Sequence, residues 1–159
     1  MDYRDVTLKA WAERVAKGEL SAEALMASTL DRIAQLNPSL SAFTELRPRE
    51  VVLAEARAVD EARTRGEPLP LVAGMPLGVK DLEDAAGLLS TYGSALYGQT
   101  PATEDSVLVS RLKQAGAIVV GKTMTPEFGC KGVTNNPRHG ICRNPFALER
   151  SPGGSSGGS

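Results

Sequence analysis

Two short apolar segments, separated by a long connection and one helix, place the strongest constraint on the fold. Residues 77–79 (LGV) and 117–120 (AIVV) are typical of buried strands, because strands covered on both faces are continuously apolar. Between them, the sequence predicts a helix that Asp105 or Ser106 caps. The residues expected to face inward on this helix are Val107, Val109 and Leu112. A strand, a crossover helix and a second strand favour a parallel pair, so we expect an α/β fold with Lys80 at the end of the first strand.

The N-terminal part carries the patterns of three helices and a short strand. The first helix ends at Gly18, which suits a left-handed C-cap, and the second runs from a Ser21 cap until Pro38 ends it. A strand at residues 42–46 and a third helix at 48–66 follow. We expect an antiparallel pair of helices and a mixed sheet flanked by helices. The residues expected to face inward are Leu8, Trp11 and Val15, then Leu25, Thr29, Ile33 and Leu36, then Val52, Ala56 and Val59.

Charge and composition exclude several classes of function. The chain has 18 Lys and Arg against 19 Asp and Glu, so it lacks the basic surplus that phosphate contacts need, and we expect no direct binding of nucleic acid. The N-terminus scatters Asp2, Arg4, Asp5 and Lys9 where a signal peptide needs an apolar stretch, and no run approaches a membrane span. We therefore expect a cytoplasmic protein without membrane contact.

The cysteine and histidine content argues against a metal site. Only Cys130, Cys142 and a single His139 are present, which supply neither a disulfide framework nor a Cys/His zinc site. The sequence shows no cluster of carboxylates either. We therefore expect no metal and no cofactor.

Residues 116–123 (GAIVVGKT) match the phosphate-binding-loop pattern GxxxxGK[ST] letter for letter. Such a loop must wrap its backbone N–H groups around phosphates and then begin a helix. Here the middle residues are Ile and Val in an expected strand, and the following residues 124–126 do not open a convincing helix. We interpret the match as accidental.

The last seven residues are only Gly and Ser, which alone are typical of a flexible linker. Their chemical interpretation is a loop that brings a serine hydroxyl to a partner base. Lys80 is the candidate base, although a strand-end lysine paired with Asp81 is the ordinary interpretation. Because the usual lysine pKa is about 10.4, a lysine base requires burial that lowers this pKa. We expect Lys80 to be buried and uncharged in the active enzyme.

Four segments, in this order, resemble the amidase signature family: 74–81 (GMPLGVKD), 117–128 (AIVVGKTMTPEF), 143–146 (RNPF) and 151–159 (SPGGSSGGS). The N-terminal stretches GELSAEAL and LNPSLSAF are also similar to it. The resemblance covers nearly the whole chain. It implies an amidase signature fold, a mixed sheet flanked by helices that is incomplete here, with residues 1–159 forming the N-terminal part of a single domain.

The resemblance also implies roles for individual residues. Lys80 falls on the basic lysine of the family's Ser-Ser-Lys arrangement, and Ser155 falls on its bridging serine, which adopts a cis backbone conformation. The nucleophilic serine and the oxyanion hole would lie beyond Ser159, so Ser156 and Ser159 are not nucleophile candidates and would hydrogen-bond the loop. Gly129 follows PEF at a position whose backbone contacts substrate in the family.

The activity implied by the resemblance is hydrolysis of a small carboxylic amide to an acid and ammonia or amine, without cofactor and with a homo-oligomer as an option. Residues 124–129 (MTPEFG) favour a stand-alone amidase over the alternative, the A-type component of glutamyl-tRNA(Gln) amidotransferase, which usually carries Asp-Glu-Phe followed by Ala-Met-Gly. A non-catalytic domain with relic residues is a second alternative. The chain alone is expected to be inactive.

Overall fold

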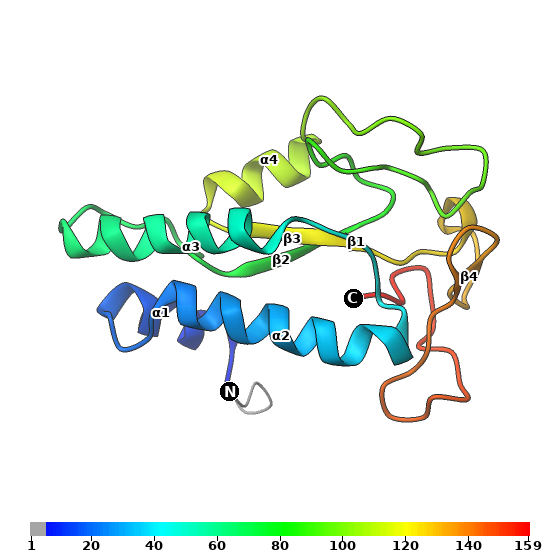
Figure 1. The fold of residues 1–159 in the computed structure, drawn as a ribbon, viewed down its shortest axis with the longest axis horizontal. Helices are drawn as coiled ribbons and strands as arrows, with labels where there is room; N and C mark the ends of the chain where they lie inside the picture. The colour runs from blue at the N-terminus through cyan, green and yellow to red at the C-terminus, as the bar shows by residue number, and fades with distance from the viewer. Residues whose placement is uncertain (1–5) are drawn as a thin grey trace. The chain divides into compact units, whose positions relative to one another are not determined.

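The computed structural model describes residues 6–159 and mixes α-helices and β-strands along the chain (Figure 1). Asp2, Arg4 and Asp5, whose charges argued against a signal peptide, lie outside the described residues. The elements are α1 (Leu8–Lys17), α2 (Ala22–Leu40), β1 (Phe43–Leu46), α3 (Arg49–Thr64), β2 (Pro76–Lys80), α4 (Val107–Gln114), β3 (Ile118–Thr123), a 3-10 turn (Glu127–Gly129), β4 (Asn135–Asn136) and β5 (Gly140–Ile141). The predicted α/β class is confirmed.

The chain divides into two compact units. The first comprises Met1–Arg32, Arg47–Leu77 and Ser110–Val120, and the second comprises Ile33–Leu46, Gly78–Val109 and Gly121–Ser159. The first unit holds α1, α3 and the beginning of α2. The second holds β1, the C-terminal residues of β2 and β3, and all the loops that follow them.

Helix α1 has caps at both ends. The Thr7 hydroxyl accepts a hydrogen bond from the Ala10 N–H at 3.2 Å, and Gly18 adopts the left-handed conformation at φ 74°. Trp11 and Val15 are buried as predicted, but the inward prediction for Leu8 is wrong, because this first residue of the helix is 59% exposed.

A carboxylate of α3 supports the predicted Ser21 cap of α2. Asp60 accepts hydrogen bonds from the Ser21 hydroxyl at 2.7 Å and from the Ala22 and Glu23 N–H groups at 2.9 and 3.1 Å. These groups would otherwise lack partners in the first turn of a helix. Farther along the same two helices, ion pairs join Arg57 to Glu23 and Arg49 to Asp31, so α2 and α3 run antiparallel.

The predicted end of α2 at Pro38 is wrong, because the helix continues to Leu40 with Pro38 inside it. A proline in the last turn removes one backbone hydrogen bond, which matters least where the helix is about to end. Asn37 then shapes the exit: its side-chain amide donates to the Phe43 carbonyl at 3.0 Å and accepts from the Phe43 N–H at 2.7 Å. The side chain of Asn37 thus guides the chain from α2 into β1.

The three main strands form a mixed sheet in the order β1-β3-β2, as predicted. Strands β1 and β3 are antiparallel, with Phe43 opposite Thr123 and Glu45 opposite Lys122. The backbone hydrogen bonds of β2 with β3 advance in the same direction along both strands, from Ile118–Met75 to Asp81–Thr123, so this pair is parallel. Lys80 ends β2, where the prediction placed it.

The elements around β3 correct two details of the prediction. Ser106 caps α4, because its hydroxyl accepts from the Val109 N–H at 3.3 Å, but Val107 is 70% exposed and does not face inward. Strand β3 extends past residue 120 to Thr123, and all six of its residues are buried. The GKT of the phosphate-loop pattern therefore lies in a buried strand and not in a loop. No helix within residues 6–159 has the length and apolar character needed to cross a membrane.

Candidate active site

Lys80 and Ser155, which are 75 residues apart in sequence, meet in the second unit. The Lys80 ammonium Nζ donates to the Ser155 hydroxyl Oγ at 2.7 Å. Both side chains are partly exposed in this chain, so Lys80 is less buried than expected. The geometry places the amine where a proton could pass between the two groups.

Asp81 is not the ion-pair partner of Lys80. Its side chain is fully buried, with one carboxylate oxygen accepting from the Thr91 N–H at 2.8 Å and the other from the Thr91 hydroxyl. The nearest cation to Asp81 is the Lys122 ammonium at 3.8 Å. The ordinary interpretation of Lys80 as a strand-end lysine bound to its neighbour is therefore wrong.

The Gly/Ser loop is packed tightly and is not a free linker. The Thr125 hydroxyl donates to the Ser155 carbonyl at 3.0 Å, and the peptide bond between Gly154 and Ser155 is cis. A Cβ at Gly154 would lie 2.5 Å from the Lys131 carbonyl, and one at Gly158 would lie 2.2 Å from the Ala42 carbonyl. Glycine is needed at these two positions because backbone passes so close.

The structure places Gly129 beside the lysine–serine pair. A Cβ at Gly129 would lie 3.8 Å from the Ser155 Oγ, and the residue adopts a φ of 68°. Its own N–H donates to the Pro126 carbonyl at 2.8 Å, so the turn already uses this donor. Ser156 is exposed, and the serine that Lys80 contacts is Ser155.

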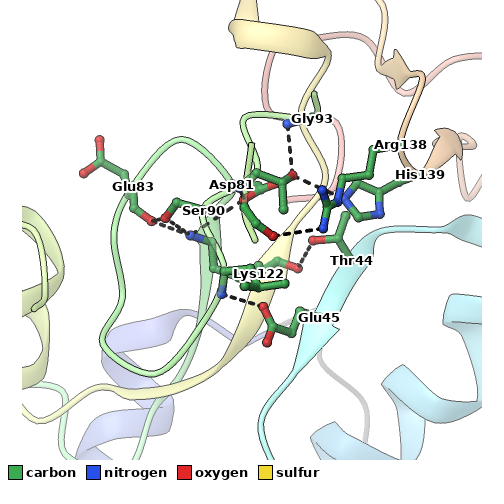
Figure 2. Close-up of polar contacts among 12 residues, drawn as sticks. Thr44, Glu45, Asp81, Glu83, Ser90, Gly93, Lys122, Arg138 and His139 are labelled. Atoms are coloured by element: carbon green, nitrogen blue, oxygen red, sulfur yellow. Dashed lines mark hydrogen bonds and ion pairs between the residues drawn. The ribbon is translucent and has the colours of Figure 1, made fainter. Parts of the chain in front are cut away.

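Sequence reasoning missed a buried lysine close to this site. Lys122 has no exposed surface, and its ammonium donates to the Glu83 carbonyl and to the Ser90 hydroxyl at 3.1 Å (Figure 2). Burial lowers the pKa of Lys122, whereas the nearby carboxylates, Asp81 first, act in the opposite direction. The signal was available, since Lys122 follows the apolar run AIVVG, but the phosphate-loop pattern drew attention to it for another reason.

His139, excluded as a metal ligand from the composition, lies in the same buried region. Its Nε2 is 3.3 Å from the Thr91 hydroxyl, on the other side of Thr91 from Asp81. Burial lowers the pKa of His139, and the Arg138 guanidinium lowers it further, whereas the Asp81 carboxylate acts to raise it. The neutral imidazole is therefore favoured at neutral pH.

The described residues offer no site for a metal ion built from three or more His, Cys, Asp or Glu side chains. Cys130 and Cys142 are both free thiols, the first exposed and the second buried. Burial raises the pKa of the Cys142 thiol, and the Arg143 N–H acts in the opposite direction.

Comparison with known proteins identifies the class to which this fold and site belong. The sequence model of the family described as Amidase matches residues 24–159, and the chain belongs to that family. The chain is 40% identical over 159 residues to the A-type component of glutamyl-tRNA(Gln) amidotransferase from Synechococcus, covering all of this chain and 32% of that protein.

Solved structures agree with this assignment. The native peptide amidase from Stenotrophomonas maltophilia superposes with a TM-score of 0.88 at 35% identity, covering 99% of this chain and 33% of that one. A bacterial aryl acylamidase of the amidase signature enzymes also gives a TM-score of 0.88, at 29% identity over 96% of this chain and 32% of its own. The chain thus spans about a third of the length of the relatives it matches.

Proposed function

We propose that the protein carrying this chain hydrolyses a small carboxylic amide, with Lys80 and Ser155 as members of its catalytic machinery. The observation that supports this most directly is the 2.7 Å contact between the Lys80 Nζ and the Ser155 Oγ. Family membership supports the class of reaction, since the matching family is that of the amidases. The acyl group would be held on a further serine, which the resemblance implies outside these 159 residues.

The proposed step moves a proton through Ser155. The nucleophilic serine gives its proton to the Ser155 Oγ, while the Ser155 hydroxyl proton passes to the neutral amine of Lys80. When the carbon–nitrogen bond breaks, the proton returns along the same path to the departing amine, and water then releases the acid. Ser155 suits this relay because its backbone is held by Thr125 while its hydroxyl faces the lysine.

Gly129 is proposed to contact the substrate through its carbonyl oxygen. Its N–H is committed to the Pro126 carbonyl, which leaves the carbonyl as the backbone group that could accept from an amide N–H. The would-be Cβ of Gly129 lies 3.8 Å from the Ser155 Oγ, so this position is close to where the scissile bond would sit.

The test is amide hydrolysis by the full-length protein, followed as release of ammonia or amine. Lys80→Ala is expected to lower turnover by about 10²–10⁴-fold, the usual contribution of a general base. The exposed Lys131, whose Nζ bonds only the Asn135 side chain at 3.0 Å, supplies the control Lys131→Ala, which should leave turnover unchanged. Near-normal turnover of Lys80→Ala would refute the assignment.

A second pair of variants tests the choice of serine. Ser155→Ala should remove most activity, whereas Ser156→Ala should remove less, because one hydroxyl occupies the position beside Lys80. The reverse order would transfer the relay role to Ser156.

A second candidate function is that of the A-type component of an amidotransferase, favoured by the 40% identity to such a component over the whole of this chain. The stand-alone amidase predicts ammonia release by the purified protein without partners. Release that requires partner proteins and tRNA would replace the amidase proposal. A cytoplasmic location, a homo-oligomer and the absence of direct nucleic-acid contact stay predictions alongside these two functions.

A further inference from the structure

A closed chain of hydrogen bonds surrounds the Lys80–Ser155 pair. On one side, Asp81 directly follows Lys80 and binds Thr91, whose hydroxyl lies 3.3 Å from the His139 Nε2. On the other side, the Thr125 hydroxyl holds the Ser155 carbonyl at 3.0 Å. The two sides therefore meet through whatever connects His139 to Thr125.

Asn136 makes that connection. Its side-chain oxygen accepts from the His139 N–H at 2.7 Å, and its side-chain NH₂ donates to the Thr125 carbonyl at 2.7 Å. Asn136 and Thr125 are buried, and His139 is partly buried. Every connection around the pair is thus a hydrogen bond of 2.7–3.3 Å or a covalent step along the backbone, apart from the still shorter contact of the Thr91 hydroxyl with Asp81.

The Thr91 hydroxyl fixes which nitrogen of His139 carries hydrogen. Thr91 has one hydroxyl proton, which it donates to the Asp81 carboxylate, and its oxygen accepts from the Gly93 N–H at 3.1 Å. The remaining partner, His139 Nε2, must then donate to this oxygen, because the hydroxyl has no second proton to give. His139 is therefore protonated at Nε2.

The charged groups around His139 favour its neutral form. Arg138 on the same segment donates to the Tyr97 and Gly98 carbonyls at 2.6 and 3.0 Å and opposes a second positive charge. Asp81 on the loop after β2 attracts a positive charge, but Lys122 on β3 lies within 3.8 Å of it (Figure 2). Together with burial, these groups disfavour an imidazolium at this place.

We propose that the neutral His139 ring is a positioning residue, which holds Thr91 and Asp81 through its Nε2–H and thereby fixes Lys80 opposite Ser155. The proposal rests on the function proposed above for that pair. His139 does not touch the reacting atoms. Its loss leaves the Thr91 hydroxyl without one donor and frees the loop after β2 to shift.

Two substitutions in the full-length protein separate the donor from the ring. His139→Phe removes the N–H donor, and His139→Gln keeps an uncharged donor of similar reach. Because a displacement of about 1 Å away from the chemistry can cost about 10²-fold, we expect His139→Phe to lower kcat about 10–100-fold. KM should change by less than about 3-fold, since substrate contacts are untouched. His139→Gln should restore kcat to within about 3-fold of the parent at about pH 8.

The pH profile supplies a readout that a purely structural role would not move. Between about pH 8 and pH 5, kcat of the parent should fall as the ring takes a second proton, and His139→Gln should lack that limb because it does not titrate. Equal kcat of His139→Phe and the parent at every pH would overturn the proposal. So would an equal loss in both variants with an unchanged acid limb.

Crystal structures of both variants separate this proposal from the proposed function. The Lys80 Nζ to Ser155 Oγ contact should persist in His139→Gln and exceed hydrogen-bond distance in His139→Phe, whether or not the protein hydrolyses amides. An inactive parent protein with this structural response would refute the amidase function and support positioning. An intact contact in His139→Phe would refute positioning.

Discussion

Removing the buried ammonium of Lys122 is the sharpest test of how the second unit is held together. Lys122→Met keeps a side chain of similar length in the same fully buried place but removes the charge and the three donors. The Glu83 carbonyl and the Ser90 hydroxyl each lose a donor, and Asp81 loses the nearest cation at 3.8 Å.

The magnitude follows from which groups stay behind. Removing one partner of a buried charge pair typically costs about 3–5 kcal/mol, because the other charge is left uncompensated. The apolar methionine offsets part of this, by about 1 kcal/mol for the extra buried apolar surface. We therefore expect Lys122→Met to lower the free energy of unfolding by about 2–4 kcal/mol.

Urea unfolding of the full-length protein, followed by circular dichroism, measures this change as a lower midpoint at unchanged slope. Lys9→Met is the matched control, since Lys9 is 85% exposed and its ion pair with Glu13 is a surface pair worth at most about 1 kcal/mol. If Lys122→Met unfolded at the same urea concentration as Lys9→Met, the idea that this ammonium compensates Asp81 would be refuted.

Three further outcomes are expected. Gly158→Ala should cost activity and about 2–4 kcal/mol of stability, because its Cβ would lie 2.2 Å from the Ala42 carbonyl, whereas Gly132→Ala, with nothing within 4 Å, should behave as the parent in thermal unfolding. Burial opposes ionisation of Asp60, but its hydrogen bonds and Arg63 outweigh burial and lower its pKa, so the stability it gives is present above the unfolded pKa of about 3.9 and lost as pH falls through the folded pKa; Asp60→Asn should flatten this part of the acid unfolding curve. The 159-residue chain alone should release no ammonia from any small amide, because it supplies Lys80 and Ser155 without the further serine, and Lys80-dependent release would contradict this.

Local patterns predicted the elements well where neighbouring residues decide the conformation. Ser21 and Ser106 accept from N–H groups three residues ahead, and Gly18 closes α1, as their types and positions indicated. The errors lie where distant contacts decide. Leu8 and Val107 repeat at helical spacing, yet both begin their helices and are exposed. Neither spacing nor residue type tells which end of a helix the rest of the chain leaves uncovered.

The extent of β3 shows a second limit of pattern reading. Gly121, Lys122 and Thr123 break the apolar run of AIVV, so the strand was expected to end at residue 120. The strand continues because β1 pairs with these residues on one side and the Lys122 amine finds acceptors in the loop after β2. A polar residue can be buried in a strand when its partners come from elsewhere in the sequence.

The candidate site divides along the same line. Lys80, Gly129 and Ser155 were found because glycine-rich motifs mark the places where backbone must pass closely, and those motifs resemble a known family. The chain of contacts behind them left no such mark, because it ends on backbone carbonyls: Asn136 donates to Thr125, and Thr125 donates to Ser155. A carbonyl acceptor is the same in every residue type, so the sequence records the donor but not the residue it serves. His139 illustrates the consequence, since as a lone histidine it could be excluded as a metal ligand from composition, whereas its contact with Thr91 emerged only from the folded chain.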